Sequence, residues 1–197
     1  YAYGVMGATH HALEDYGILS SLPNLTIFVP AFDEDIGFIV DDLFTTKRPA
    51  YVRLGKSEKP QQYQPPAFAS WRKLSSGNGP VVAVAGPLAG SLLAEAACLP
   101  PAKRPTIWAI SVLPFDAADL PKEFIADIAA ADCLIVCEEH ISHAGLGEML
   151  IYALTTARVP VKQFRHHHAK GYPSGRYGSQ SYHRKECGLV AKDILSG

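Results

Sequence analysis

Residues 25–55 read LTIFVPAFDEDIGFIVDDLFTTKRPAYVRLG, and this stretch decides the fold class. Residues 25–29 are short, rich in β-branched and aromatic side chains and followed by a proline, which is typical of a buried strand. Residues 33–43 carry apolar side chains at the spacing of one helical face: Ile36, Ile39, Val40 and Leu43. Residues 49–54 return to a strand pattern. A helix between two short apolar strands predicts a parallel, layered α/β sheet.

The same alternation continues on both sides of this stretch. Upstream, Thr9 is expected to cap a helix over residues 10–21. Downstream, the predicted elements are strands at 81–85, 106–112, 133–137 and 161–165, and helices at 88–99, 121–131, 145–158 and 183–195, the last with a break at Gly188. The sequence therefore predicts a three-layer α/β/α architecture with a mostly parallel sheet.

The chain is expected to divide into two units. Residues 1–56 hold the elements described first and form part of one domain. Residues 57–79 lose the alternation and are rich in Pro, Gln, Ser and Gly, so they are predicted to be a linker on the surface. Residues 80–197 are predicted to form a small α/β domain of their own.

Composition excludes several classes of protein. Of the 197 residues, 48% are hydrophobic and 19% are charged, a balance that argues against a disordered chain. The 18 Lys and Arg residues nearly cancel the 19 Asp and Glu residues, so we expect no nucleic-acid or membrane partner. The apolar runs are far shorter than the roughly 20 residues of a membrane span. The four cysteines lack metal-site spacing and are expected to be reduced core residues, which suits a cytoplasmic protein.

The first candidate for a catalytic or ligand-binding segment is residues 4–15, GVMGATHHALED. Glycines let a ligand approach the backbone closely, and the expected helix directs free N–H groups and a positive dipole end toward it. In that first turn His10 is expected to stay neutral and to hydrogen-bond a sugar hydroxyl or a carbonyl oxygen. Two alternatives remain: a glycine turn at the surface, and metal pairs formed by His10 with Glu14 and His11 with Asp15, for which no third ligand is placed.

Several motifs occur here in a fixed order and spacing: the residues 4–15 segment, the turn at 22–24, the strand end at 28–31 and the strand at 49–55. Together they closely resemble the pyrimidine-binding domain of transketolases. Residues 134–140, followed by Gly145-Leu146-Gly147, are similar to the acidic strand end and helix start of that family's C-terminal domain. The resemblance implies a thiamine-diphosphate enzyme that transfers two-carbon ketol units between sugar phosphates, or a relative such as deoxyxylulose-phosphate synthase.

The resemblance also assigns roles to residues. His10 matches the family's active-site histidine, which hydrogen-bonds substrate oxygens near the reacting carbon. Lys56 falls where the family carries a basic residue for the sugar phosphate, and Arg53 lies on the same strand end; a cation there suits a phosphate. The alternative for Arg53 and Lys56 is a solvated strand end. Met6 stands where the family often has an Asp that fixes substrate stereochemistry, and a Met side chain cannot accept a strong hydrogen bond.

The family's catalytic glutamate and its diphosphate and metal motif lie upstream of the residues present here, so cofactor-binding residues are not assigned and no metal ligand is expected. The resemblance implies that thiamine diphosphate and Mg²⁺ bind in the complete enzyme, with a diphosphate-binding domain or subunit as partner, and that the chain is a homodimer. The isolated chain, whether a fragment or a split subunit, is expected to be inactive. The rival interpretation is a noncatalytic dimerisation or regulatory module; Met6 favours it, whereas the intact Thr9-His10-His11 favours the enzyme.

Two further polar clusters leave alternatives open. Glu138, Glu139 and His140 follow a predicted strand and could form an acid/base couple, but a structural or subunit-contact role is favoured. The run His166-His167-His168 invites a metal hypothesis, but consecutive residues of an extended segment point to opposite faces. We therefore expect these three to be surface histidines.

Overall fold

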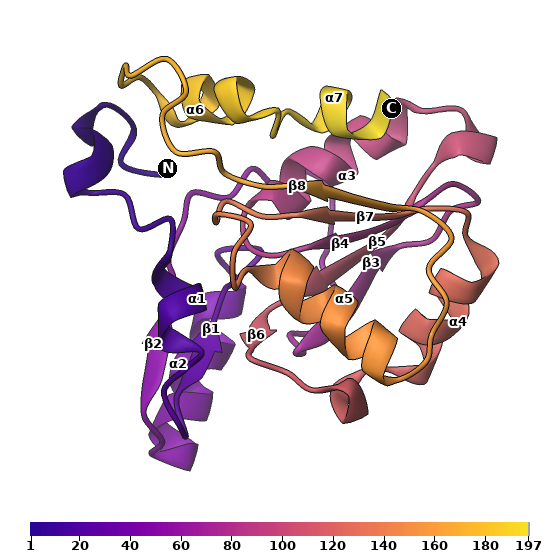
Figure 1. Cartoon of the computed structure of the whole chain (residues 1–197), viewed down its shortest axis with the longest axis horizontal. Coiled ribbons are helices and arrows are strands. Elements are labelled where there is room, and N and C mark those ends of the chain that lie inside the picture. Colours follow the sequence, from indigo (N-terminus) through magenta and orange to yellow (C-terminus); the bar gives the residue numbers. More distant parts are fainter. Residues whose placement is uncertain (197) are drawn as a thin grey trace.

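The computed structural model describes residues 1–196 and contains two sheets (Figure 1). The first sheet has the order β2-β1-β6 and comprises β1 (Thr26–Phe28), β2 (Ala50–Val52) and β6 (Val112–Leu113). β1 is parallel to β2 and antiparallel to β6. The helices α1 (Asp15–Leu19) and α2 (Asp35–Thr46) lie beside this sheet, at the lower left of Figure 1.

The second sheet has the order β3-β5-β4-β7-β8. Its strands are β3 (Trp71–Ser75), β4 (Val81–Val84), β5 (Thr106–Ile110), β7 (Leu134–Cys137) and β8 (Phe164–His167). Only the edge strand β3 is antiparallel to its neighbour. The remaining α-helices are α3 (Leu88–Cys98), α4 (Lys122–Ala130), α5 (Leu146–Thr156), α6 (Gln180–Cys187) and α7 (Ala191–Ser196). Short 3₁₀ turns lie at η1 (Gly4–Thr9), η2 (Pro101–Lys103) and η3 (Ala117–Asp119).

Helices cover both faces of the second sheet. In β4, Val82 and Val84 belong to one buried cluster, which also holds residues of α3 and α7. Val81 and Ala83 point the other way and belong to a second cluster with residues of α4 and α5. Figure 1 accordingly shows α3 and α7 on one side of the sheet and α4 and α5 on the other. The predicted α/β fold with a three-layer arrangement and a mostly parallel sheet is confirmed.

The two sheets are tied together through the predicted linker. Arg72 of β3 forms a buried two-point ion pair with Asp35 of α2, with both N–O distances at 2.7 Å. Asp35 also accepts the backbone N–H groups of Ala31 and Phe32. Part of residues 57–79 therefore belongs to the second sheet rather than to a surface linker. The domain boundaries at 56 and 80 stay a prediction.

The predicted helix over residues 10–21 is wrong. The helix α1 covers only Asp15–Leu19, and Gly7 has a positive φ of 66° that interrupts the preceding 3₁₀ turn. The Thr9 hydroxyl donates to the Met6 carbonyl instead of capping a helix. His10 therefore does not lie at a helix N-terminus, and the dipole argument for its neutral state does not apply.

Other predicted elements agree with the structure more closely. The break at Gly188 is confirmed: α6 ends there with Gly188 in the left-handed region, and α7 follows. β8 begins three residues later than predicted and includes His166. On α2, of the four apolar positions expected to be buried only Ile39 is fully so, and Val40 is 42% exposed. No helix within residues 1–196 is long and apolar enough to cross a membrane.

Candidate functional site

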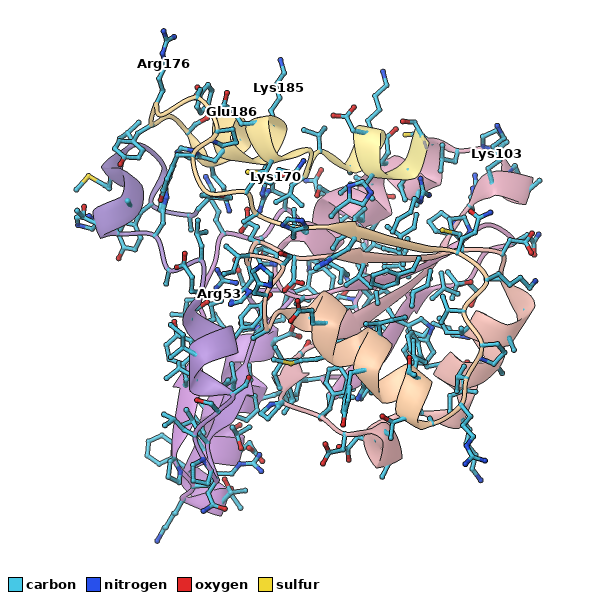
Figure 2. All side chains as sticks on the ribbon, viewed as in Figure 1. Arg53, Lys103, Lys170, Arg176, Lys185 and Glu186 are labelled. Carbon is cyan, nitrogen blue, oxygen red and sulfur yellow. The ribbon has the colours of Figure 1, made fainter. Side chains whose placement is uncertain are left out.

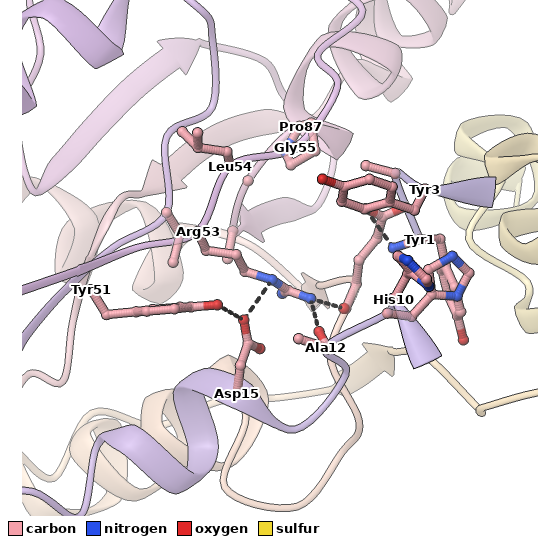
Figure 3. Close-up of a pocket in the computed structure, with 16 residues that line it drawn as sticks. Tyr1, Tyr3, His10, Ala12, Asp15, Tyr51, Arg53, Leu54, Gly55 and Pro87 are labelled. Carbon is pink, nitrogen blue, oxygen red and sulfur yellow. Dashed lines mark hydrogen bonds and ion pairs between the residues drawn. The ribbon is translucent and has the colours of Figure 1, made fainter. Parts of the chain in front are cut away.

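A cavity of about 200 Å³ opens where the N-terminal segment meets the ends of β2 and β4 (Figure 3). His10 and Arg53, two of the three predicted site residues, both line it. The third, Lys56, is exposed and does not line the cavity. The structure thus brings together residues from segments that are far apart in the sequence, including Glu139 after β7.

His10 is exposed at the edge of this cavity, with its ring beside Tyr3. Its Nδ1 lies 2.9 Å from the Thr9 hydroxyl. Because that hydroxyl donates its proton to Met6, its oxygen is left to accept from Nδ1–H. This arrangement leaves Nε2 of His10 as a hydrogen-bond acceptor for a ligand.

Arg53 is held by contacts on several sides. Its Nη2 donates to the carbonyl oxygens of Ala12 and Glu139 at 2.7 and 2.8 Å, and its Nε lies 3.1 Å from Asp15 Oδ2. The guanidinium also lies 5.1 Å from the centre of the Tyr16 ring. Arg53 lies inside the molecule, whereas Arg176 and Lys185 project away from it (Figure 2). Arg53 therefore holds the cavity wall in place, and only its Nη1 has neither a hydrogen-bond partner nor an ion-pair partner within residues 1–196.

Asp15 and Tyr51 also line the cavity, although neither is among the predicted site residues. The Tyr51 hydroxyl donates to Asp15 Oδ2 at 2.8 Å. Burial and the neighbouring Asp15 carboxylate raise the pKa of Tyr51 to about 12, so the hydroxyl stays protonated at neutral pH. From the sequence, Asp15 is expected only as a metal partner of His11. Asp15 belongs to the same motif as His10, and this shared motif is the sequence feature that could have predicted its place in the cavity.

His11 also lines the cavity, and its ring packs within a cluster of other rings. Its Nδ1 lies 2.8 Å from the Tyr172 hydroxyl, and its ring meets those of Tyr1 and His183 edge-on at about 5.3 Å. These contacts attach the N-terminal segment to the loop before α6, which lies beside it in Figure 1. Within residues 1–196 no three His, Cys, Asp or Glu side chains are placed to hold a metal ion, so the two metal pairs gain no third ligand.

This ring cluster is expected to loosen in acid. Burial, with the nearby positive charges, lowers the pKa of His11 from 6.5 to about 4. The unfolded chain therefore takes up a proton at a higher pH than the folded one, and stability is lost as the pH falls from about 6.5 to 4. Hydrogen exchange of residues 1–12 should rise over this window. The His11→Gln variant, which cannot titrate there, should lose this part of the pH dependence; an unchanged profile would contradict the assignment.

Glu138 is a buried structural group. One oxygen, Oε2, accepts the N–H of Leu146 at 2.8 Å and the Tyr16 hydroxyl. The other, Oε1, accepts the N–H of Gly147 at 2.9 Å and lies 2.6 Å from His166 Nε2. The first N–H groups of α5 are thus satisfied by a carboxylate that follows β7. Of the alternatives for this cluster, the contacts support the structural role.

The side chains of Glu139 and His140 also make contacts within the chain. The Nε of Arg184, in α6, donates to Oε1 of Glu139 at 2.6 Å. Burial acts to raise the pKa of Glu139. The positive charge of Arg184 and of other nearby groups outweighs burial and holds that pKa below its usual range. His140 stacks on Tyr16 at 3.9 Å, accepts the Gly17 N–H at Nε2 and donates from Nδ1 to the Ile141 carbonyl. Both side chains connect elements within this chain.

The expectation of three surface histidines at 166–168 is wrong for His166. Its side chain is largely buried against Glu138, and a Cβ on Gly147 would come within 2.4 Å of its ring. His167 lies on the other face of β8, where Nδ1 is 3.3 Å from the Gly188 carbonyl. Burial lowers the pKa of His167. The segment is extended, as predicted, and its alternate residues face different layers.

The comparisons with known proteins point to one family. No family model matches the chain. It is 28% identical over 173 residues to one subunit of the apulose-4-phosphate transketolase of Phocaeicola vulgatus, covering 82% of this chain and 52% of that protein. It is 25% identical to the corresponding subunit of the Actinobacillus succinogenes enzyme, covering 98% of this chain and 62% of that one. The chain therefore spans between half and two thirds of the length of these curated relatives.

Solved structures share the fold. A split-gene transketolase described as an inactive beta4 tetramer has a TM-score of 0.76 at 23% identity, covering 96% of this chain and 60% of its own. The transketolase of Leishmania mexicana gives a TM-score of 0.67 at 17% identity, with 98% of this chain covered and 28% of its own. These comparisons confirm the predicted resemblance: the chain is similar to transketolase subunits and shares its fold with solved transketolases. Both curated relatives are single subunits of transketolases.

Proposed function

We propose that the chain is a subunit or part of a thiamine-diphosphate-dependent transketolase that transfers two-carbon ketol units between sugar phosphates. The observation that carries this is the cavity in which His10 and Arg53 meet, in a chain similar to subunits of apulose-4-phosphate transketolases. An exposed imidazole acceptor beside a buried network of hydroxyl, carboxylate and guanidinium groups suits a polyhydroxylated, anionic substrate.

Each predicted site residue has a place in this proposal. His10 Nε2 hydrogen-bonds a substrate oxygen near the reacting carbon. Arg53 holds Asp15 in the cavity wall by an ion pair, and its Nη1 donates a hydrogen bond to the substrate. Lys56, outside the cavity but exposed three residues further along, meets the phosphate of an extended sugar phosphate as a point charge.

The residues present do not form a complete site for thiamine diphosphate and Mg²⁺. The cavity, at about 200 Å³, lies below the roughly 300–1,000 Å³ typical of cofactor pockets. A magnesium ion prefers several oxygen ligands, and residues 1–196 hold no three-carboxylate cluster around the cavity. In the proposal a diphosphate-binding domain or subunit supplies these groups, and His10 faces it.

The isolated chain is expected to show no ketol transfer and no tight cofactor binding, because it lacks those ligands. Calorimetric titration of the chain with thiamine diphosphate and Mg²⁺ should give no measurable heat of binding. A Kd in the micromolar range would contradict the proposal. Mixing the chain with a purified transketolase subunit that carries the diphosphate domain should restore ketol transfer.

The second candidate is a noncatalytic dimerisation or regulatory module with a transketolase C-terminal fold, and a further alternative is a deoxyxylulose-phosphate synthase-like enzyme. The module is favoured by Met6, which is half-exposed and does not line the cavity. The mixing experiment separates the two, because a regulatory module would bind the partner without adding activity. We also propose that the chain acts in the cytoplasm and self-associates as a homodimer. Sedimentation that shows only monomer at tens of micromolar would contradict the homodimer.

A further inference from the structure

The turn that carries His10 is built around Gly7. The carbonyl oxygen of Gly7 accepts the backbone N–H groups of both His10 and His11, at 3.0 and 3.1 Å. Gly7 has a φ of 66° and a ψ of −155°, a backbone conformation that is essentially restricted to glycine. The direction of the Gly7 carbonyl therefore sets the direction in which the His10 side chain leaves the turn.

Tyr177, in the loop before α6, lies directly against this glycine. A Cβ added to Gly7 would lie 2.7 Å from three carbons of the Tyr177 ring, so the ring fills the space that a side chain would need. The next residue of the loop also reaches the N-terminal segment, because the carbonyl oxygen of Gly178 would lie 3.4 Å from a Cβ on Gly4. Two glycines of the segment that carries His10 thus pack against two consecutive residues of this loop.

The Tyr177 ring is held in place from its other side. It meets the ring of Tyr172 edge-on, with 4.9 Å between the ring centres, and its centre lies 6.5 Å from that of His183 in α6. The backbone N–H of Gly178 donates to Nε2 of His183 at 3.2 Å. The Tyr177 hydroxyl has no hydrogen-bond partner within residues 1–196, and the side chain is 53% exposed. The ring, rather than the hydroxyl, is therefore the part of Tyr177 that makes the contact with Gly7.

We propose that Tyr177 is a positioning residue for His10: its ring fixes the Gly7 turn, and the turn holds Nε2 of His10 at the cavity. This inference deepens the proposed function and rests on it. Tyr177 does not line the cavity, so it acts through the turn and not on the substrate. Since Nδ1 of His10 is bonded to the Thr9 hydroxyl, a shift of the turn moves both side chains together. A displacement of about 1 Å in a reacting group can cost about 100-fold in rate.

Steady-state kinetics of the reconstituted enzyme tests the positioning role. Tyr177→Ala should lower kcat at least about 10-fold and change KM less than about 2-fold, because the cations proposed to bind the substrate, Arg53 and Lys56, stay in place. Tyr177→Phe keeps the ring and should restore the wild-type rate. Tyr152→Ala is the matched control, since it removes a 74% exposed tyrosine of α5 outside the cavity, and it should leave both constants unchanged.

A double-mutant cycle tests whether Tyr177 acts through His10. In a His10→Ala background there is no imidazole left to position, so adding Tyr177→Ala should cause no further loss of kcat. If Tyr177→Ala lowers kcat by the same factor in both backgrounds, the inference is wrong. A Tyr177→Phe variant as slow as Tyr177→Ala would also contradict it, because the ring contact with Gly7 would then be irrelevant.

Nuclear magnetic resonance of the chain labelled with ¹⁵N-histidine gives a readout that does not depend on activity. The wild-type chain and Tyr177→Phe should show His10 in one tautomer, with its proton on Nδ1. In Tyr177→Ala the tautomers should average, and the backbone N–H groups of His10 and His11 should exchange at least about 10-fold faster, with the rest of the chain unchanged. An unchanged tautomer and unchanged exchange in Tyr177→Ala overturn this inference alone. A wild-type mixture without ketol transfer overturns the proposed function, and the resonance data still decide whether Tyr177 places His10.

Discussion

Replacing His10 by Ala is expected to lower kcat/KM of the reconstituted enzyme about 10- to 1000-fold, which corresponds to about 1.4 to 4 kcal/mol of transition-state stabilisation. The reason is that Nε2 of His10 is the acceptor left open at the cavity once Nδ1 is bonded to Thr9. Its hydrogen bond would strengthen as charge develops on the substrate. Steady-state kinetics with a purified partner subunit measures the loss, and cofactor affinity should barely change.

The choice of control follows from the structure. The neighbouring His11 is unsuitable, because it is held among the rings of Tyr1, Tyr172 and His183 and its removal would disturb the fold. His143 is 86% exposed and lies outside the cavity, so His143→Ala should keep wild-type rates. His10→Gln, which keeps a hydrogen-bonding side chain, should recover part of the activity. Wild-type rates for His10→Ala would mean that residues 4–15 form only a surface turn.

The periodic segments of the second unit are predictable from the sequence. The continuous apolar runs of β4 and β7 are buried on both faces, and this is what a central parallel strand requires. Prolines and glycines mark where elements begin and end, as Gly188 does between α6 and α7. The sequence pattern does not reveal β3. Its burial alternates along the strand, but one of the buried positions is Arg72, which pairs with Asp35, so apolar and polar residue types do not alternate.

The contacts around the candidate site are harder to predict from the sequence. His10 and Arg53 can be selected from their motifs, but their environment is set by distant segments. Arg53 binds the backbone carbonyls of Ala12 and Glu139. Every residue has a backbone carbonyl, so these contacts cannot be predicted from the residue types. The helix expected after Thr9 is replaced by an irregular connection because tertiary contacts of His11 override local propensity.

The largest effect on stability is expected from Glu138→Gln. The carboxylate accepts from Tyr16, Leu146 and Gly147 and bonds His166, so it joins α1, α5 and β8 to the end of β7. A glutamine amide has one acceptor oxygen, and its NH₂ group would face donors. Breaking a buried charged network of this kind costs about 3 to 5 kcal/mol of the free energy of unfolding. Urea denaturation followed by circular dichroism measures this loss.

The same variant separates the two interpretations of Glu138. The matched surface change is Glu123→Gln, whose carboxylate is exposed and pairs with Lys73; it should cost about 1 kcal/mol or less. If Glu138 holds the fold, Glu138→Gln lowers the unfolding midpoint strongly, and protein still folded at low temperature keeps its rate per active molecule. If it were a general acid or base, the rate would fall at least about 100-fold while the unfolding midpoint stayed near that of Glu123→Gln. Because both oxygens of Glu138 are already committed to buried donors, we expect the first result.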